Sequence, residues 1–160
     1  MKAALDALDR QIVARLGRDA RTSNRQIADE VGVTEGTVRG RIKRMQEERQ
    51  IRITAVTNID RYQDAAIAYV WVEVERSELA EDIARQMAAM REFGFVGLMM
   101  GRFDILGITM VRNAEHLARF VHENVSVLEG VRRTESTLSV NFVKHDYRMS
   151  RIVNGKTANE

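Results

Sequence analysis

The sequence contains no cysteine and no proline in its 160 residues. Without cysteine the chain can form no disulfide and no thiolate metal site, and this composition fits the reducing cytoplasm, where we expect to find the protein. No stretch approaches the roughly 18 apolar residues that a membrane-spanning helix needs, and the opening residues lack the apolar segment of an export signal. We therefore expect neither membrane insertion nor export.

The composition is that of a folded protein, with 44% hydrophobic and 30% charged residues. A chain of this length can hold one medium domain or two small ones, and small domains have small cores. Assembly of several subunits is therefore expected.

Positive charge is concentrated in the first third of the chain. Residues 1–60 carry twelve Lys and Arg against nine Asp and Glu, although the formal net charge of the whole chain is only +2. Residues 39–44 hold four positive charges in six positions with no acidic residue. Such a cluster is either a solvated helix face or a nucleic-acid contact, and its surroundings favour the second interpretation.

Three helices are predicted before residue 50. Apolar residues spaced by three and four predict an amphipathic helix over 5–16. Ser23 and Gln26 match a capping box at the start of a short second helix, which Gly32 would end. Thr34 is a good N-cap for a third helix that carries the basic cluster. A short helix, a tight turn and a basic helix are typical of a helix-turn-helix, whose last helix enters the major groove of DNA.

The third helix is expected to bury Val38, Ile42 and Met45. Its opposite side then carries Gly36 and Gly40. These glycines either let the helix backbone approach DNA closely or are neutral variation without a binding role. Hydroxyls and backbone N–H groups at the start of the second helix would suit a phosphate, or serve only as caps. The residues that we expect to contact DNA are Thr22, Ser23, Asn24, Thr34, Glu35, Gly36, Thr37, Arg39, Gly40, Lys43 and Arg44.

Beyond residue 48 the hydrophobic period changes to two, which predicts a connecting strand over 51–56. Strands and helices then alternate in the order βαββαβ, which is the ferredoxin-like arrangement. The predicted fold is therefore α+β, with a helix-turn-helix (winged-helix-like) domain at 1–50, a linker strand at 51–64, a ferredoxin-like domain at 65–147 and a polar tail at 148–160. The six elements of the ferredoxin-like domain are expected at 66–75, 78–93, 95–100, 105–111, 114–128 and 131–143.

The first of these strands has bulky residues on both faces. Alternate residues from Ala68 to Val74 would point to the helices, which leaves Tyr69, Trp71 and Glu73 on the opposite face. A second subunit would cover these aromatic side chains, or the linker of the same chain would do so.

Several separated motifs together resemble the Lrp/AsnC family of leucine- and asparagine-responsive regulators. In the first half they are Leu5-Asp-x-Leu-Asp-Arg-x-Ile12, Ile27-Ala-x-x-Val-Gly-Val33 and Thr37-Val-Arg-x-Arg-Ile-x-Arg-Met45. In the second half they are Gly101-Arg-Phe-Asp104 and Gly130-Val-x-x-Thr134. Gly107 departs from the usual pattern, since a larger apolar residue is common there.

This resemblance implies a homodimer, often assembled into tetramers or octamers, that binds palindromic operator DNA and responds to an amino acid. The implied effector site comprises Met100, Gly101, Arg102, Phe103, Asp104, Thr134, Ser136 and Thr137. Asp104 could bind the ammonium group of an amino acid, and Arg102 or backbone N–H groups its carboxylate. Alternatively, Gly101 and Asp104 only shape a β-turn.

Two other classes of protein remain possible at this point. A metabolite-binding module of an enzyme could share the ferredoxin-like fold, but the three histidines are not spaced for a metal and no nucleophile elbow occurs. No catalytic residue, metal site or cofactor is therefore predicted. A chromosome-organising protein that binds many DNA sites without a ligand would use the same basic residues.

Overall fold

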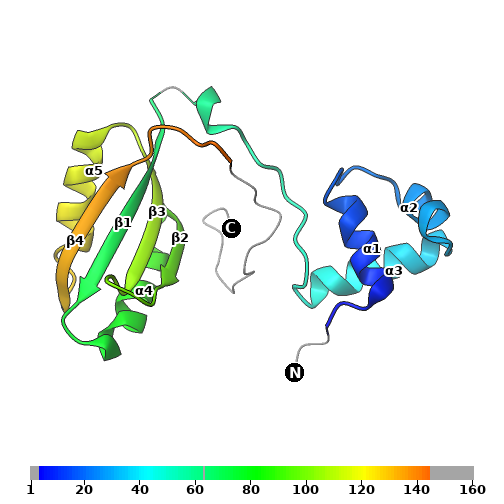
Figure 1. Ribbon diagram of the computed structural model, residues 1–160, viewed down its shortest axis with the longest axis horizontal. Helices are drawn as coiled ribbons and strands as arrows, with labels where there is room; N and C mark the ends of the chain where they lie inside the picture. Colours follow the sequence, from blue (N-terminus) through cyan, green and yellow to red (C-terminus); the bar gives the residue numbers. More distant parts are fainter. Residues whose placement is uncertain (1–3, 63, 145–160) are drawn as a thin grey trace. The chain divides into compact units, whose positions relative to one another are not determined.

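The computed structural model describes residues 4–62 and 64–144, so the predicted tail at 148–160 lies outside the described residues. The described chain divides into two compact units, residues 4–56 and 57–144. Each unit has its own hydrophobic core. Figure 1 shows the helical unit and the sheet unit with the elements named below.

The first unit contains three helices, α1 (Ala7–Leu16), α2 (Asn24–Val31) and α3 (Glu35–Glu47). Gly32 ends α2 in the left-handed conformation, with φ of 74°, as the sequence predicts. Thr34 caps α3 by accepting a hydrogen bond from the backbone N–H of Thr37. The core is formed by the apolar residues Ile12, Ile27, Ala28, Val38, Ile42 and Met45. The predicted helix-turn-helix is thus confirmed.

The helix caps differ in one respect from the prediction. Ser23 accepts from the Gln26 backbone, but the Gln26 amide points to Glu30 instead of back to Ser23, so the capping box at α2 is only half formed. The complete capping box lies at α1, where Asp6 and Asp9 each accept from the other's backbone N–H.

The predicted strand at 51–56 was wrong. Residues 51–58 adopt neither helix nor strand, and only a 3-10 turn at Ile59–Arg61 follows. Ile53 and Val56 are exposed. An alternating sequence needs a neighbouring strand to complete its hydrogen bonds, and within the described residues 4–56 there is no strand to pair with.

The second unit is a four-stranded antiparallel sheet in the order β2-β3-β1-β4 with two helices, as the βαββαβ prediction requires (Figure 1). Its strands are β1 (Ala66–Val74), β2 (Phe93–Leu98), β3 (Ile105–Val111) and β4 (Val131–Leu138). The connecting helices are α4 (Ala80–Ala89) and α5 (Ala114–Phe120).

Several element boundaries differ from the predicted ones. A 3-10 turn at Ser77–Leu79 precedes α4, and α5 continues as a π-helical turn over Val121–Val125. Strand β4 ends at Leu138, because β1 pairs with it only as far as that residue. Hydrophobic periodicity persists across these ends, so it could not mark them.

The two faces of β1 differ as predicted. Ala68, Val70 and Val72 are fully buried and pack with α4 and α5 residues such as Ile83 and Leu117. The opposite face keeps Tyr69 and Trp71 partly exposed, and the Trp71 ring lies 5.8 Å from that of Phe103. Residues of β2 and β3 extend this apolar surface, which we call the outer sheet face: Tyr69, Trp71, Phe95, Leu106, Ile108 and Met110.

Packing in the core explains why position 107 is a glycine, which the sequence alone did not reveal. A Cβ atom at this position would lie 2.4 Å from the ring of Phe93 and 3.1 Å from the methyl group of Met87. The Phe93 ring in turn packs against Phe120, with centroids 5.4 Å apart. The glycine therefore makes room for an aromatic pair in the core.

We predict that Gly107→Val lowers the free energy of unfolding of the second unit by about 1–3 kcal/mol, because the added methyl groups overpack the core. Urea unfolding followed by the fluorescence of Trp71, the single tryptophan of the chain, measures this. Gly94→Val is the matched control, since Gly94 is exposed and its nearest neighbour lies 4.0 Å away. Equal effects of the two substitutions would contradict the packing role.

Candidate nucleic-acid interface

The exposed side of α3 is hollowed. Gly36, Thr37, Gly40, Arg41 and Arg44 line a shallow depression, which we call the α3 hollow. A Cβ atom at position 40 would meet nothing within 4 Å, and one at position 36 only the Thr34 hydroxyl at 3.9 Å. Packing among residues 4–62 and 64–144 therefore does not require glycine at either position. The two glycines leave the helix backbone accessible to a large partner.

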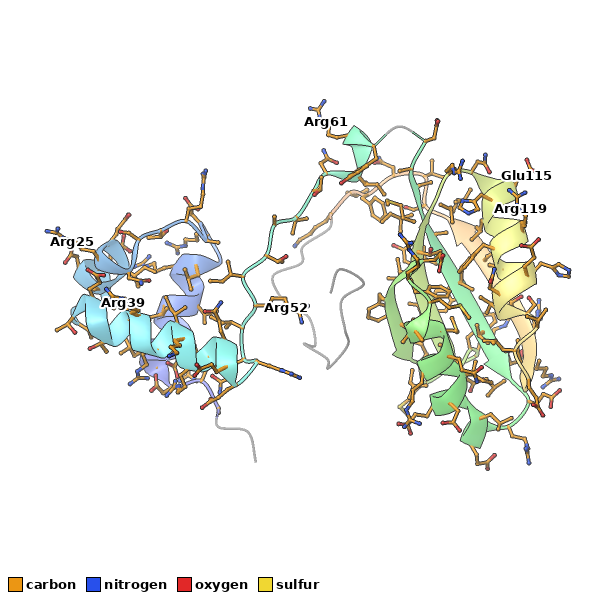
Figure 2. All side chains as sticks on the ribbon, turned by 180° about the vertical axis from the view of Figure 1, so that it is seen from behind. Arg25, Arg39, Arg52, Arg61, Glu115 and Arg119 are labelled. Carbon is orange, nitrogen blue, oxygen red and sulfur yellow. The ribbon has the colours of Figure 1, made fainter. Side chains whose placement is uncertain are left out.

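Two of the four basic residues of α3 form exposed ion pairs within the helix. Arg39 pairs with Glu35, and Lys43 lies 3.8 Å from Glu47. Exposed pairs of this kind contribute little free energy, so a phosphate can replace the carboxylate at small cost. Arg25 projects from α2 in the same unit, as Figure 2 shows together with Arg39.

The other two basic residues, Arg41 and Arg44, bind carboxylates of α1. Arg44 Nη2 lies 2.5 Å from Asp9 Oδ2, and Arg41 Nη1 lies 3.1 Å from Asp9 Oδ1 and also binds Asp6. The Asp9 side chain is only 1% exposed. Arg44 was predicted to contact DNA, but in this structure its guanidinium serves to bind α1. We call these four residues the α1–α3 ion cluster.

The ion cluster was not predicted, although its signal was in the sequence. Asp6 and Asp9 are three residues apart on α1, and so are Arg41 and Arg44 on α3. Residues three apart lie on one side of a helix, so two such pairs can face each other. What the sequence does not contain is the crossing of α1 and α3 that brings them together.

The ion cluster shifts the acidity of both carboxyls. The pKa of Asp6 lies below its ordinary value, first because the Asp9 backbone N–H donates to it and then because Arg41 does. Burial alone would raise the pKa of Asp9, but hydrogen bonds from Arg41, the Asp6 backbone and Arg44 outweigh burial and lower it. Both groups therefore favour the ionised form.

The predicted contacts at the start of α2 have partners within the chain. The Thr22 hydroxyl donates to the Asp19 carbonyl at 2.8 Å, and Ser23 Oγ accepts from the Gln26 N–H. Asn24 is the first residue of α2. The capping role of Ser23 is therefore sufficient to explain it, and a phosphate contact by these three residues stays a prediction.

The predicted effector loop connects β2 to β3. Asp104 Oδ2 accepts a hydrogen bond from the Val74 N–H at 2.9 Å, and the Asp104 N–H donates to the Val72 carbonyl. Gly101 has a φ of 155°, and Met100 is fully exposed. These hydrogen bonds tie Asp104 to the end of β1, and both of its predicted roles stay predictions.

Arg102 lies over the ring of Phe103, 5.1 Å from its centroid, and forms an ion pair with Glu135 at 3.0 Å. Glu135 was not among the predicted residues. It lies opposite Trp71 on the outer sheet face, and the register of β1 and β4 is needed to find it.

The three predicted residues of β4 do not share a face. Thr134 and Ser136 lie opposite Val72 and Val70, which puts them on the side that the helices cover, whereas Thr137 lies opposite Tyr69. The Thr134 hydroxyl is 3.0 Å from that of Ser126. Of the three, only Thr137 is therefore on the same face as Glu135.

The described part of the chain holds no group of three or more His, Cys, Asp or Glu residues placed to bind a metal ion. None of its helices combines the length and apolar character needed to cross a membrane.

A helix-turn-helix with an accessible basic helix, joined to a ferredoxin-like unit, defines a DNA-binding transcription regulator. The AsnC-type helix-turn-helix domain matches residues 5–46 of this chain. The C-terminal dimeric alpha+beta barrel domain of AsnC-type regulators matches residues 62–152. The chain belongs to the AsnC-type family of transcriptional regulators and is not an enzyme, as its sequence motifs predicted.

The chain is 33% identical over 146 residues to an HTH-type transcriptional regulator of Pyrococcus horikoshii, covering 91% of this chain and 97% of that protein. It is 29% identical to one of Pyrococcus abyssi, covering 91% and 92% of the two chains. Among solved structures, AsnC of E. coli covers 94% of this chain and 99% of its own, with a TM-score of 0.77 and 16% identity. A transcriptional regulator from Neisseria meningitidis in complex with L-Met covers 92% and 97%, with a TM-score of 0.78 and 18% identity.

We predict that the first unit loses stability when the solution is acidified. Because the pKa values of Asp6 and Asp9 are lowered by folding, their contribution is present above the unfolded-state pKa and is lost as the pH falls through the folded value. The urea midpoint of the Ile12 and Val38 amide NMR signals should stay constant down to about pH 5 and fall below it.

The variant Asp6→Asn keeps the N-cap of α1 but removes one of the two carboxylates. Its urea midpoint should fall less steeply with acid than that of the unchanged chain. An identical pH dependence in both proteins would show that the ion cluster does not stabilise the unit.

Proposed function

We propose that the protein is a sequence-specific operator-binding regulator that docks the α3 hollow against the major groove. The observation that carries this proposal is the pair of glycines at positions 36 and 40, which no packing among the described residues requires. Glycine on an exposed helix face costs about 1 kcal/mol relative to alanine. This loss of helix stability is offset if the backbone, free of side chains at these positions, can approach the base edges of DNA.

Around the α3 hollow, Thr37 presents a hydroxyl and Arg39 and Lys43 present cations. A hydroxyl can contact either base edges or phosphates, and arginine bonds guanine with two parallel hydrogen bonds. Arg39 and Lys43 can exchange their carboxylate partners for DNA because those pairs are exposed. This action on DNA takes place in the compartment that contains the chromosome, which we expect to be the cytoplasm.

The family of the chain has a dimeric C-terminal domain. We infer that the outer sheet face is the surface that a second copy covers, because it gathers six large apolar residues on one side of the sheet. Palindromic operators match such a two-fold dimer. Assembly of dimers into a tetramer or octamer belongs to the same proposal, and Met100, fully exposed on the effector loop, would suit a contact between dimers.

We further propose that the loop from Met100 to Asp104 binds an amino acid at this interface. The N. meningitidis neighbour was solved with L-Met. In this chain Asp104 Oδ2 is engaged by Val74, so Oδ1 is the oxygen that an ammonium group would meet. The Arg102 guanidinium offers donors for a carboxylate, provided that its pair with Glu135 opens.

The DNA-binding proposal predicts that Arg39→Ala and Gly40→Leu each weaken binding to a duplex selected from a random-sequence pool. Loss of one specific arginine contact costs about 1–3 kcal/mol, or roughly 5- to 150-fold in affinity. Leucine at position 40 should act by steric exclusion. Fluorescence anisotropy measures affinity, and size-exclusion chromatography checks that the oligomer is intact.

Ala88→Leu, on the exposed surface of α4, is the control for Gly40→Leu and should bind as the unchanged chain does. Unchanged affinity in a folded Gly40→Leu protein would refute the clearance role of the glycines. Equal affinity of the unchanged chain for selected and random duplexes would instead indicate a chromosome-organising protein.

The effector proposal predicts that calorimetric titration with the individual amino acids finds at least one ligand, and that Asp104→Asn weakens its binding at least tenfold. Asparagine keeps an oxygen for the Val74 N–H but loses the charge that attracts ammonium. Asp82→Asn on α4 removes the same charge elsewhere and should have no effect. If Asp104→Asn bound the ligand normally, Asp104 would be only a turn residue.

A further inference from the structure

The α1–α3 ion cluster adjoins the surface that faces DNA in the proposed function. Arg41 and Arg44 form part of the α3 hollow, next to Gly36, Thr37 and Gly40. Their side chains are 28% and 43% exposed, whereas the Asp9 side chain that binds both is 1% exposed. Two long cations are therefore held back toward α1 by a buried carboxylate while they border the candidate interface.

The cluster is electrically balanced. Asp6 and Asp9 supply two negative charges and Arg41 and Arg44 supply two positive ones, and hydrogen bonds join the carboxylates to both guanidinium groups. The rim of the α3 hollow thus attracts a phosphate less strongly than its two arginines alone would do.

The contact with Asp9 leaves one hydrogen-bond donor of Arg44 unsatisfied. Its Nε atom is buried and has no hydrogen-bond partner in the described part of the chain. An arginine that turned outward could satisfy this donor with water or a phosphate oxygen. The contact with Asp9 is therefore maintained at a cost to Arg44, which favours a role beyond stabilising the helix pair.

We propose that Asp9, assisted by Asp6, is a positioning residue for DNA recognition that withholds Arg41 and Arg44 from the DNA phosphates. This inference rests on the proposed function, in which the α3 hollow meets DNA. With both arginines neutralised, non-specific attraction is reduced, and binding depends more on contacts that distinguish one sequence from another. The two carboxylates thereby lower the sequence-independent part of the affinity for DNA.

The physical basis is the release of counterions from DNA. Each cation that newly contacts a phosphate steepens the dependence of log affinity on log salt by about 0.9. Because this term is nearly independent of sequence, it raises affinity for random DNA as much as for an operator. Freeing the two arginines should therefore raise the affinity for random and selected duplexes by a similar factor.

The test measures binding of a random-sequence duplex across a salt series, with a selected duplex in parallel. Asp9→Asn should steepen the salt slope by about one for each arginine released per bound subunit, and should raise non-specific affinity roughly tenfold at low salt. Asp6→Asn, which leaves Asp9 in place, should give a smaller change of the same sign. In both variants the affinity for the selected duplex should rise by a factor similar to that for the random duplex.

Two further variants separate this role from a merely structural one. Adding Arg44→Gln to Asp9→Asn should return the salt slope toward that of the unchanged chain, since the released cation is gone. Glu30→Gln makes the same change in net charge within the unit and frees Arg15, which pairs with Glu30 at 2.8 Å outside the α3 hollow. Its salt slope should equal that of the unchanged chain.

Circular dichroism establishes which variants fold. If Asp9→Asn does not fold, the Asp6→Asn variant provides the test, because asparagine at position 6 preserves the N-cap of α1. An unchanged slope in the folded carboxylate variants, or an equal increase in Glu30→Gln, would overturn the inference. Failure of the unchanged chain to bind any duplex would instead overturn the proposed function.

Discussion

The buried carboxylate of Asp9 is the constraint on which the DNA-binding unit depends. It lies between α1 and α3 and binds two arginines of α3, at 2.5 and 3.1 Å. A buried carboxylate of this kind is tolerated only when it is paired and hydrogen-bonded, so the pairs with α3 compensate its burial. The same contacts determine which cations of α3 remain at the surface. Helix packing and the charge on the exposed side of α3 are therefore set by one group of residues.

The second unit depends on a different constraint, namely that β1 carries apolar residues on both of its faces. Its helix-facing residues complete a core within the chain, while Tyr69 and Trp71 extend the outer sheet face. An apolar surface of this size on a small domain is consistent with the dimeric domain of the family. In the proposed mechanism the sheet joins two copies, and the dimer presents two α3 helices to a palindromic operator.

Much of this organisation could be predicted from the sequence, and the failures have physical reasons. Helical periodicity and N-caps located α1, α2 and α3, because those signals are local. Alternation wrongly predicted a strand at 51–56, since it cannot show whether a pairing partner exists. Glu135 beside Arg102 and Asp9 beside Arg44 depend on strand register and helix crossing, which join residues 33 and 35 positions apart. No local pattern contains that information.

Disulfide cross-linking to DNA is the most direct test of the central claim, that the α3 hollow faces DNA. Because the chain contains no cysteine, an introduced thiol is the only one that can react. A single thiol introduced by Thr37→Cys at the α3 hollow, or by Gln86→Cys on α4 as a control, can form a disulfide with a duplex carrying a thiol tethered to a base in the major groove. The account predicts cross-linking at position 37 and none at position 86. Cross-linking at position 86 with none at position 37, in proteins that bind the duplex equally well, would contradict it.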